Sequence, residues 1–234
     1  MQCRMLLCCI ALVLAACADK PVDDALFPLA PGRSWTYRVS TAIDEDGATQ
    51  HEALVLSNRG AEAFDGSPAW RRRSDSGVEY WLRSDTSGIY RVAARSPPDA
   101  EPRADHPPRY VLRSPIAVGT EWQASTAPYV LARKNEVPRE VRRTHKDLPM
   151  RYRIAALGQT VQTPAGTFDQ CVRVDGRAQV HLYVDAMMQW RDIPLDTSEW
   201  YCPGVGLVRL ERKEPSPSRF MVGGTVTMEL MAWQ

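Results

Sequence analysis

Strict alternation of apolar and polar side chains limits how this chain can fold more than any other feature of its sequence. In the stretch 34–40, Trp35, Tyr37 and Val39 alternate with polar residues, and the same period of two returns in 150–156. Successive side chains of a β-strand point to opposite faces, so this spacing predicts strands that bury one face and expose the other. Half-buried strands of this kind are typical of antiparallel sheets.

Turn residues and aromatic residues extend this prediction to the whole chain. The 234 residues include 18 prolines, 7 tryptophans and 8 tyrosines, which favours strands separated by many turns. Outside the N-terminal apolar run, no stretch has the period of a convincing amphipathic helix. We therefore expect an all-β fold of about 11 or 12 strands, and sheets of that size curl or close. The expected architecture is a single curved antiparallel meander, a half-barrel or open barrel, and the alternative is a two-sheet β-sandwich.

The same strand pattern predicts a single domain over 27–234. A proline-rich stretch at 96–108 is the one plausible boundary, but strand patterning resumes unchanged at 110–113. The basic run at 134–146 predicts either a short helix or a pair of solvated strands. The stretch 186–198 predicts a loop, although an unusually apolar one.

The N-terminus has the features of a secretory leader followed by a lipidation site. One arginine precedes an apolar run at 5–14, and this run is too short to cross a bilayer. Residues 14–17, L-A-A-C, resemble the bacterial lipobox, in which the cysteine is lipidated and becomes the first mature residue. The resemblance implies a signal peptide at 1–16, a lipidated Cys17 and a tether over 17–26. An ordinary cleaved leader with a stray cysteine is the alternative.

The residues after this cysteine suggest where the mature chain is delivered. Ala18 occupies the position at which an aspartate would resemble an inner-membrane retention signal, and Asp19 comes one place later. We therefore expect the N-terminal lipid anchor to attach the protein to a membrane. The expected membrane is the outer membrane, with the protein facing the periplasm. A diacyl or triacyl anchor agrees with the rule that stable attachment takes more than one chain.

The charge balance of the mature chain argues against nucleic acid as a partner. The sequence has 29 basic and 28 acidic residues, and removing Arg4 with the leader leaves 28 of each. A chain so close to neutrality has no basic field to attract a polyanion.

Two cysteines remain outside the leader and the lipidation site, and they predict a disulfide between Cys171 and Cys202. An oxidising compartment permits such a bridge, and two buried thiols are the alternative. The alternation in 168–174 places Phe168, Val172 and Val174 on one face and Cys171 on the other. The bridge is therefore expected outside the main core.

Four short phrases resemble a loose group of uncharacterised bacterial lipoproteins. They are F-P-L-A-P-G-R-S-W-T-Y at 27–37, V-G-T-E-W at 118–122, T-P-A-G-T-F-D-Q-C at 163–171 and W-Y-C-P-G-V-G-L-V at 200–208. The resemblance implies a curved β-sheet similar to that of the lipoprotein-localisation (Lol) carriers, which hold acyl chains in a concave sheet. Those carriers cover the cavity with helices, which this sequence does not predict. The resemblance supplies no catalytic residue.

The sequence contains no motif that predicts catalysis. The histidines at 51, 106, 145 and 181 are isolated, so no metal site is predicted. A nucleophile elbow, a phosphate-binding loop and a dinucleotide fingerprint are all missing. We therefore expect no catalytic residues, no cofactor and no enzymatic activity.

Two functions agree with these features. The first is a non-catalytic binding module that holds an apolar ligand, such as an acyl chain, on the concave face of the sheet. The candidate ligand-binding residues are Trp35, Tyr37, Trp81, Trp122 and Trp190. Plain core packing is the alternative at each of these positions. The second function is a structural or assembly lipoprotein that docks an envelope protein partner through the loops at 96–108 and 186–198.

Overall fold

The structure is a computed structural model that describes residues 24–45, 47–134 and 140–234. The predicted signal peptide, the lipidation site Cys17 and most of the tether lie outside these residues. The last part of the tether forms a short 3-10 helix, η1 (Asp24–Leu26).

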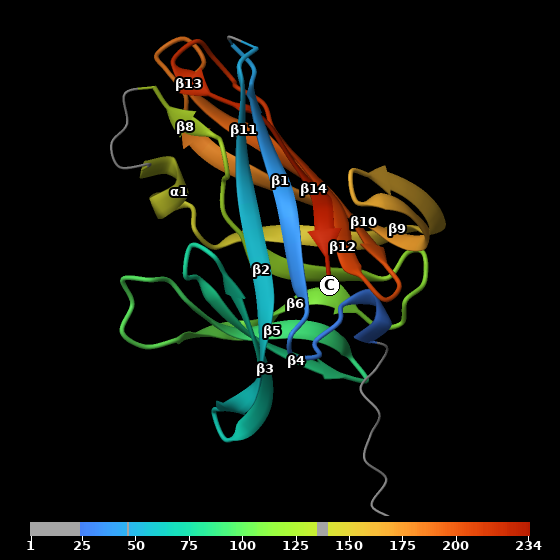
Figure 1. The fold of residues 1–234 in the computed structure, drawn as a ribbon. Coiled ribbons are helices and arrows are strands. Elements are labelled where there is room, and N and C mark those ends of the chain that lie inside the picture. The colour runs from blue at the N-terminus through green and yellow to red at the C-terminus, as the bar shows by residue number, and fades with distance from the viewer. Residues whose placement is uncertain (1–23, 46, 135–139) are drawn as a thin grey trace, which may run out of the picture.

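One antiparallel sheet of twelve strands forms almost the whole fold (Figure 1). The strand order is β6-β5-β4-β3-β2-β1-β14-β12-β11-β10-β9-β7. The strands of this sheet are β1 (Ser34–Ile43), β2 (Thr49–Phe64), β3 (Ser67–Ser74), β4 (Glu79–Asp85), β5 (Gly88–Arg95), β6 (Arg103–Arg113), β7 (Glu121–Thr126), β9 (Leu148–Thr163), β10 (Gly166–Tyr183), β11 (Trp190–Cys202), β12 (Gly206–Glu214) and β14 (Gly224–Trp233). The prediction of a single curved antiparallel sheet is confirmed, and the two-sheet sandwich is wrong.

The sheet curls until its two edge strands, β6 and β7, lie close together. Arg109 of β6 donates a hydrogen bond from Nε to the carbonyl oxygen of Ser125 in β7, at 2.8 Å. No ladder of backbone hydrogen bonds joins β6 and β7 in the described part of the chain. The fold is therefore a nearly closed barrel with one seam.

Two small elements lie outside the main sheet. β8 (Ala132–Arg133) and β13 (Met221–Val222) form a two-stranded sheet. A single-turn α-helix, α1 (Glu140–Thr144), buries Val141 in the main hydrophobic cluster. The short-helix interpretation of the basic run is therefore confirmed for part of that run. Among the described residues, no helix is both long and apolar enough to span a membrane.

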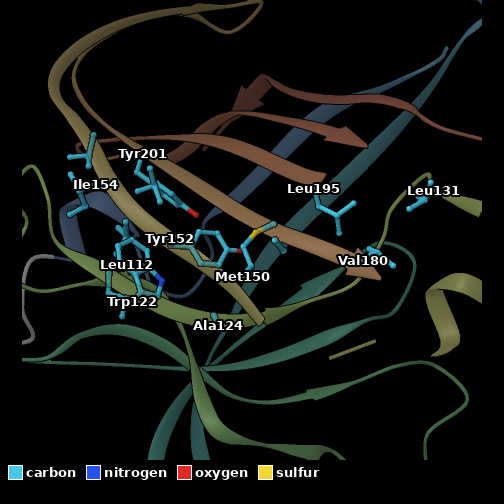
Figure 2. Close-up of a cluster of buried hydrophobic side chains, with 14 of the residues drawn as sticks. Leu112, Trp122, Ala124, Leu131, Met150, Tyr152, Ile154, Val180, Leu195 and Tyr201 are labelled. Carbon is cyan, nitrogen blue, oxygen red and sulfur yellow. The ribbon is translucent and has the colours of Figure 1, made fainter. Parts of the chain in front are cut away.

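The main hydrophobic cluster fills much of the space inside the curled sheet (Figure 2). Leu82 of β4 and Leu195 of β11 belong to the same cluster, although their strands are far apart in the sheet order. Only the inner face of a curled sheet brings such strands together. Met150, Ile154 and Leu195 are completely buried there.

The predicted loop at 186–198 is wrong for most of its length, because β11 begins at Trp190. Ile193, Leu195 and Thr197 are buried and the residues between them are exposed, which is the period of a half-buried strand. Pro194 breaks no ladder on the β12 side, because the pairing with β12 begins only at Asp196.

The predicted loop at 96–108 is also shorter than expected, because β6 begins at Arg103. Its prolines, Pro107 and Pro108, lie in an edge strand of the sheet. Edge strands tolerate proline because the missing amide donor faces no neighbouring strand.

The predicted disulfide between Cys171 and Cys202 is confirmed. It joins the adjacent strands β10 and β11 within a second hydrophobic cluster, separate from the main one. The prediction that Phe168 shares a face with Val172 and Val174 is wrong. A bulge at Gln170, where φ is 57°, interrupts the alternation, so Phe168 packs against the second cluster.

Candidate functional site

The structure separates the five aromatic residues predicted to bind a ligand. Trp122 lies in the main cluster, whereas Trp35 and Tyr37 lie in the second cluster with the disulfide. Trp81 belongs to a third cluster with Val92 and Ala93, and Trp190 is 60% exposed. The five residues therefore do not form one surface.

Three of these aromatic residues donate hydrogen bonds that hold different parts of the sheet together. Trp35 donates from Nε1 to the carbonyl oxygen of Val205 at 2.7 Å, and Tyr37 donates to that of Leu207 at 2.8 Å. Trp81 donates to Glu62 at 2.5 Å. These contacts tie β1 to β12 and to the turn that precedes it, and they tie β4 to β2.

Trp122 differs from them because its polar atom has no partner. The residue is 5% exposed, and its indole Nε1 is buried without a hydrogen bond among the described residues. Its ring stacks on Tyr152, with centroids 5.6 Å apart and an interplanar angle of 12°. Figure 2 shows the two rings together on the inside of the sheet. A buried donor without an acceptor costs free energy.

Tyr152 connects this indole with three further polar side chains, and we call the whole set the inner polar cluster. Its members are Arg109, Trp122, Tyr152, Glu199 and Tyr201. Tyr201 donates its hydroxyl to Glu199 Oε2 at 2.5 Å, and Arg109 Nη2 lies 3.5 Å from the Tyr152 hydroxyl. The members come from β6, β7, β9 and β11, so only the curled sheet brings them together.

Burial shifts the titration of the cluster's acidic groups upward. It raises the pKa of Glu199 above its ordinary value, against the opposing effects of Tyr201 and Arg109. Burial likewise raises the pKa of Tyr152 and of Tyr201, with Glu199 adding to both shifts. Burial alone would lower the pKa of Arg109, but the neighbouring tyrosines and Glu199 raise it overall. Burial thus disfavours the charged forms of the three acidic groups, and the negative charges around Arg109 favour its charged form.

Two members of the inner polar cluster keep accessible surface inside the sheet. Glu199 faces inward, since it lies two residues from Tyr201 on the same strand, yet it is half-buried and not buried. Arg109 is half-buried as well, and so are Trp70 and Tyr80, which pack against the main cluster. These four side chains therefore keep accessible surface beside the main cluster.

The N-terminal segment 25–31 closes one end of this interior. Asn58 donates to the carbonyl oxygens of Pro28 and Ala30, and Arg72 donates to that of Pro28 at 2.8 Å. The Arg72 guanidinium also lies over the rings of Phe27 and Trp35. Burial lowers the pKa of Arg72 to about 10.

A buried ion pair fixes the segment that precedes β8. Glu214 is completely buried, pairs with Arg212 at 2.8 Å and accepts the backbone N–H groups of Tyr129, Val130 and Leu131. Every oxygen of this carboxylate is thus occupied. No group of three or more metal-binding side chains occurs in the described residues.

Sequence patterns did not single out Arg109, Tyr152, Glu199 and Tyr201 as a group. Glu199 and Tyr201 are two residues apart, a spacing that puts a carboxylate beside a buried tyrosine on one face of a strand. That inward-facing carboxylate was the available signal. The meeting of β6, β9 and β11 depends on how far the sheet curls, which short-range patterns do not encode.

Comparisons with known proteins do not assign this chain to a family. No family model matches it, and no curated protein matches it.

Two solved structures are similar over most of their length. One is a putative lipoprotein from Parabacteroides distasonis, with a TM-score of 0.40, 15% identity and coverage of 89% of this chain and 98% of that chain. The other is a putative exported protein with a YmcC-like fold from Bacteroides fragilis, with a TM-score of 0.38, 16% identity and coverage of 88% and 96%. Similarities at this level assign no function.

Proposed function

We propose that this protein is a non-catalytic binding module of the bacterial envelope, which holds a small apolar or amphiphilic molecule inside its curled sheet. The observation that carries the proposal is the partly accessible interior. Arg109, Glu199 and Tyr80 face inward and keep free surface, while the surrounding side chains are buried. Ligand sites are typically apolar spaces with a few polar groups.

The envelope location and the lipid anchor belong to the same proposal. A leader at 1–16, lipidation at Cys17 and a tether to residue 26 would hold the domain at the outer membrane, facing the periplasm. A likeness to the Lol carriers would supply an acyl chain as the ligand. Fractionation tests the anchor, because Cys17→Ala is expected to move the protein from the membrane fraction to the soluble fraction.

Analysis of the bound molecule tests the binding proposal itself. The full-length protein, expressed with its leader and purified in mild detergent, is expected to release a stoichiometric apolar compound on extraction, seen by mass spectrometry. Tyr80→Ala removes part of the inner wall and is expected to lower the amount. Tyr183→Ala removes an exposed tyrosine, 40% accessible, and serves as the matched control. A folded protein that is empty in every preparation contradicts the proposal.

A second candidate is docking of a protein partner, and exposed apolar residues favour it. Met187 is 93% exposed, Trp190 is 60% exposed and Phe220 is 50% exposed. Arg133 links their segments, because it donates to the Val184 carbonyl and contacts Met221. Exposed apolar patches often mark interaction sites. Photo-crosslinking from position 187 in cells is expected to capture one envelope protein if this function holds.

A further inference from the structure

We infer that the ligand carries a carboxylate, which accepts hydrogen bonds from Trp122 and Arg109 inside the curled sheet. The inference rests on the proposed binding function and adds the chemical class of the ligand to it.

Trp122 supplies the first observation. Its Nε1–H is buried without an acceptor in the described part of the chain, and its ring is held by the stack on Tyr152. Buried donors are nearly always paired, and each exception requires an explanation. An acceptor brought by a ligand explains this exception.

Arg109 supplies the second observation. Among the other inward-facing arginines, Arg91 pairs with Asp105 at 2.6 Å and Arg212 pairs with Glu214. Arg72 has no carboxylate partner in the described chain, but it donates to Asn58 and to the Pro28 carbonyl oxygen. Arg109 has no carboxylate within 4.0 Å among the described residues, and its hydrogen bonds use only Nε and Nη2. A half-buried guanidinium without an ion partner favours an anionic ligand.

Tyr152 brings these two donors together. Its ring contacts Trp122, and its hydroxyl lies 3.5 Å from Arg109 Nη2. The two donors therefore border the same part of the interior. A carboxylate presents two acceptor oxygens, one for each donor, and its single charge meets less repulsion from the neighbouring Glu199 than a doubly charged phosphate monoester would.

Glu199 is an acidic neighbour of Arg109. Burial raises the pKa of its carboxyl group, against the opposing effects of Tyr201 and Arg109, which weakens its competition with a ligand for the guanidinium.

The remaining wall is apolar and indicates the body of the ligand. The residues Trp70, Tyr80 and Leu82 come from β3 and β4. In the sheet, these two strands lie on one side of β6, and β7 lies across the seam on the other side. Leu82 belongs to the same hydrophobic cluster as Trp122, and Tyr80 and Trp70 pack against that cluster, so the apolar wall adjoins the indole donor. The ligand class is an organic monocarboxylate with an apolar body.

Three probes with the same chain test the inference on the wild-type protein. They are dodecanoate, dodecanol and dodecyl phosphate, and binding is measured by titration calorimetry on the delipidated full-length protein. Dodecanoate is expected to bind about tenfold more tightly than dodecanol, because hydrogen bonds to a charged group are the strong ones. Equal affinity for dodecanoate and dodecanol would overturn the inference. Tighter binding of dodecyl phosphate would overturn the assignment to a carboxylate.

Two variants locate the head group. Trp122→Phe keeps the ring and removes only the N–H donor, and it is expected to weaken dodecanoate binding about tenfold with dodecanol binding unchanged. Arg109→Met is expected to do the same, and Trp122→Phe remains decisive if that variant fails to fold. Trp190→Phe and Arg113→Gln alter exposed residues and are the controls. Equal losses for dodecanoate and dodecanol would contradict the assignment.

The probes also separate this inference from the proposed function. If dodecanol and dodecanoate bind with equal affinity, the proposed binding function stands and the carboxylate assignment is rejected. If no probe binds and the protein purified from cells is empty, both are rejected.

Discussion

Glu199 is a carboxylate that faces the inside of the sheet, and its environment opposes its charge. Burial raises its pKa, so the folded chain keeps a proton at a pH where the unfolded chain has released it. The free energy of unfolding is therefore expected to fall as the pH rises from roughly 4.3, the ordinary value for glutamate, through the raised value, and then to level off.

Glu199→Gln should remove this fall while keeping an acceptor for the Tyr201 hydroxyl. The variant is expected to match the wild type in acid and to exceed its stability at neutral pH. Urea unfolding at several pH values between 4 and 8 measures this, with Glu121→Gln, at an exposed position of β7, as the matched loss of a carboxylate. A variant that is less stable than wild type at neutral pH would show that the charge of Glu199 is needed.

Glu214 differs from Glu199 because it is a buried carboxylate in which both oxygens have hydrogen-bond partners. Glu214→Gln leaves the buried Arg212 guanidinium without its counter-ion and is expected to cost about 3–5 kcal/mol. Glu211→Gln, on the same strand but partly exposed, is expected to change the urea midpoint far less. Equal losses in the two variants would falsify this distinction.

At the scale of the elements, the disulfide links two strands that are already paired. Cys171 and Cys202 are 31 residues apart, and closing a loop of that length contributes about 3–4 kcal/mol through the unfolded chain. The double variant Cys171→Ala, Cys202→Ala is expected to lose that amount in urea unfolding. Reductant should lower the free energy of unfolding of the wild type and leave that of the double variant unchanged. If reductant leaves the wild-type value unchanged as well, the estimate is wrong.

The sequence predicted most strands because their alternation is local. Trp35, Tyr37 and Val39 needed only a period of two to be recognised. The start of β11 was missed because the adjacent Met187 and Met188 break the alternation just before it and Pro194 lies within it. Both features hide the period of two when the stretch is considered alone. The bulge at Gln170 was missed because it depends on how β9 and β10 pair.

At the scale of the whole molecule, the barrel is closed by side chains at its seam. The described chain has no backbone ladder between β6 and β7, so the outer amides of both strands lack the pairing that those of β10 have on both sides. Hydrogen exchange measured by mass spectrometry is expected to be faster in β6 and β7 than in the centre of β10. Equal protection would indicate that the seam closes by strand pairing in solution.

The curled shape also explains which parts of the site could be predicted. The aromatic residues were found because tryptophan and tyrosine are conspicuous in strands, and one of them, Trp122, lies in the inner polar cluster. Arg109 was not found, because its approach to Tyr152 joins strands at opposite edges of the sheet order. Such contacts depend on the total curvature of twelve strands.

The pairing of β1 with β14 sets the order in which a growing chain can complete this fold. β1 lies between β2 and β14, and β14 ends one residue before the last residue of the sequence. A nascent chain can form the β1–β2 hairpin early, but the other side of β1 stays unpaired until β14 leaves the ribosome. β14 follows all the other described strands in the sequence, so the two halves of the sheet are joined after those strands have been translated. A chain truncated before Gly224 would expose the edges of both β1 and β12 and is expected to aggregate.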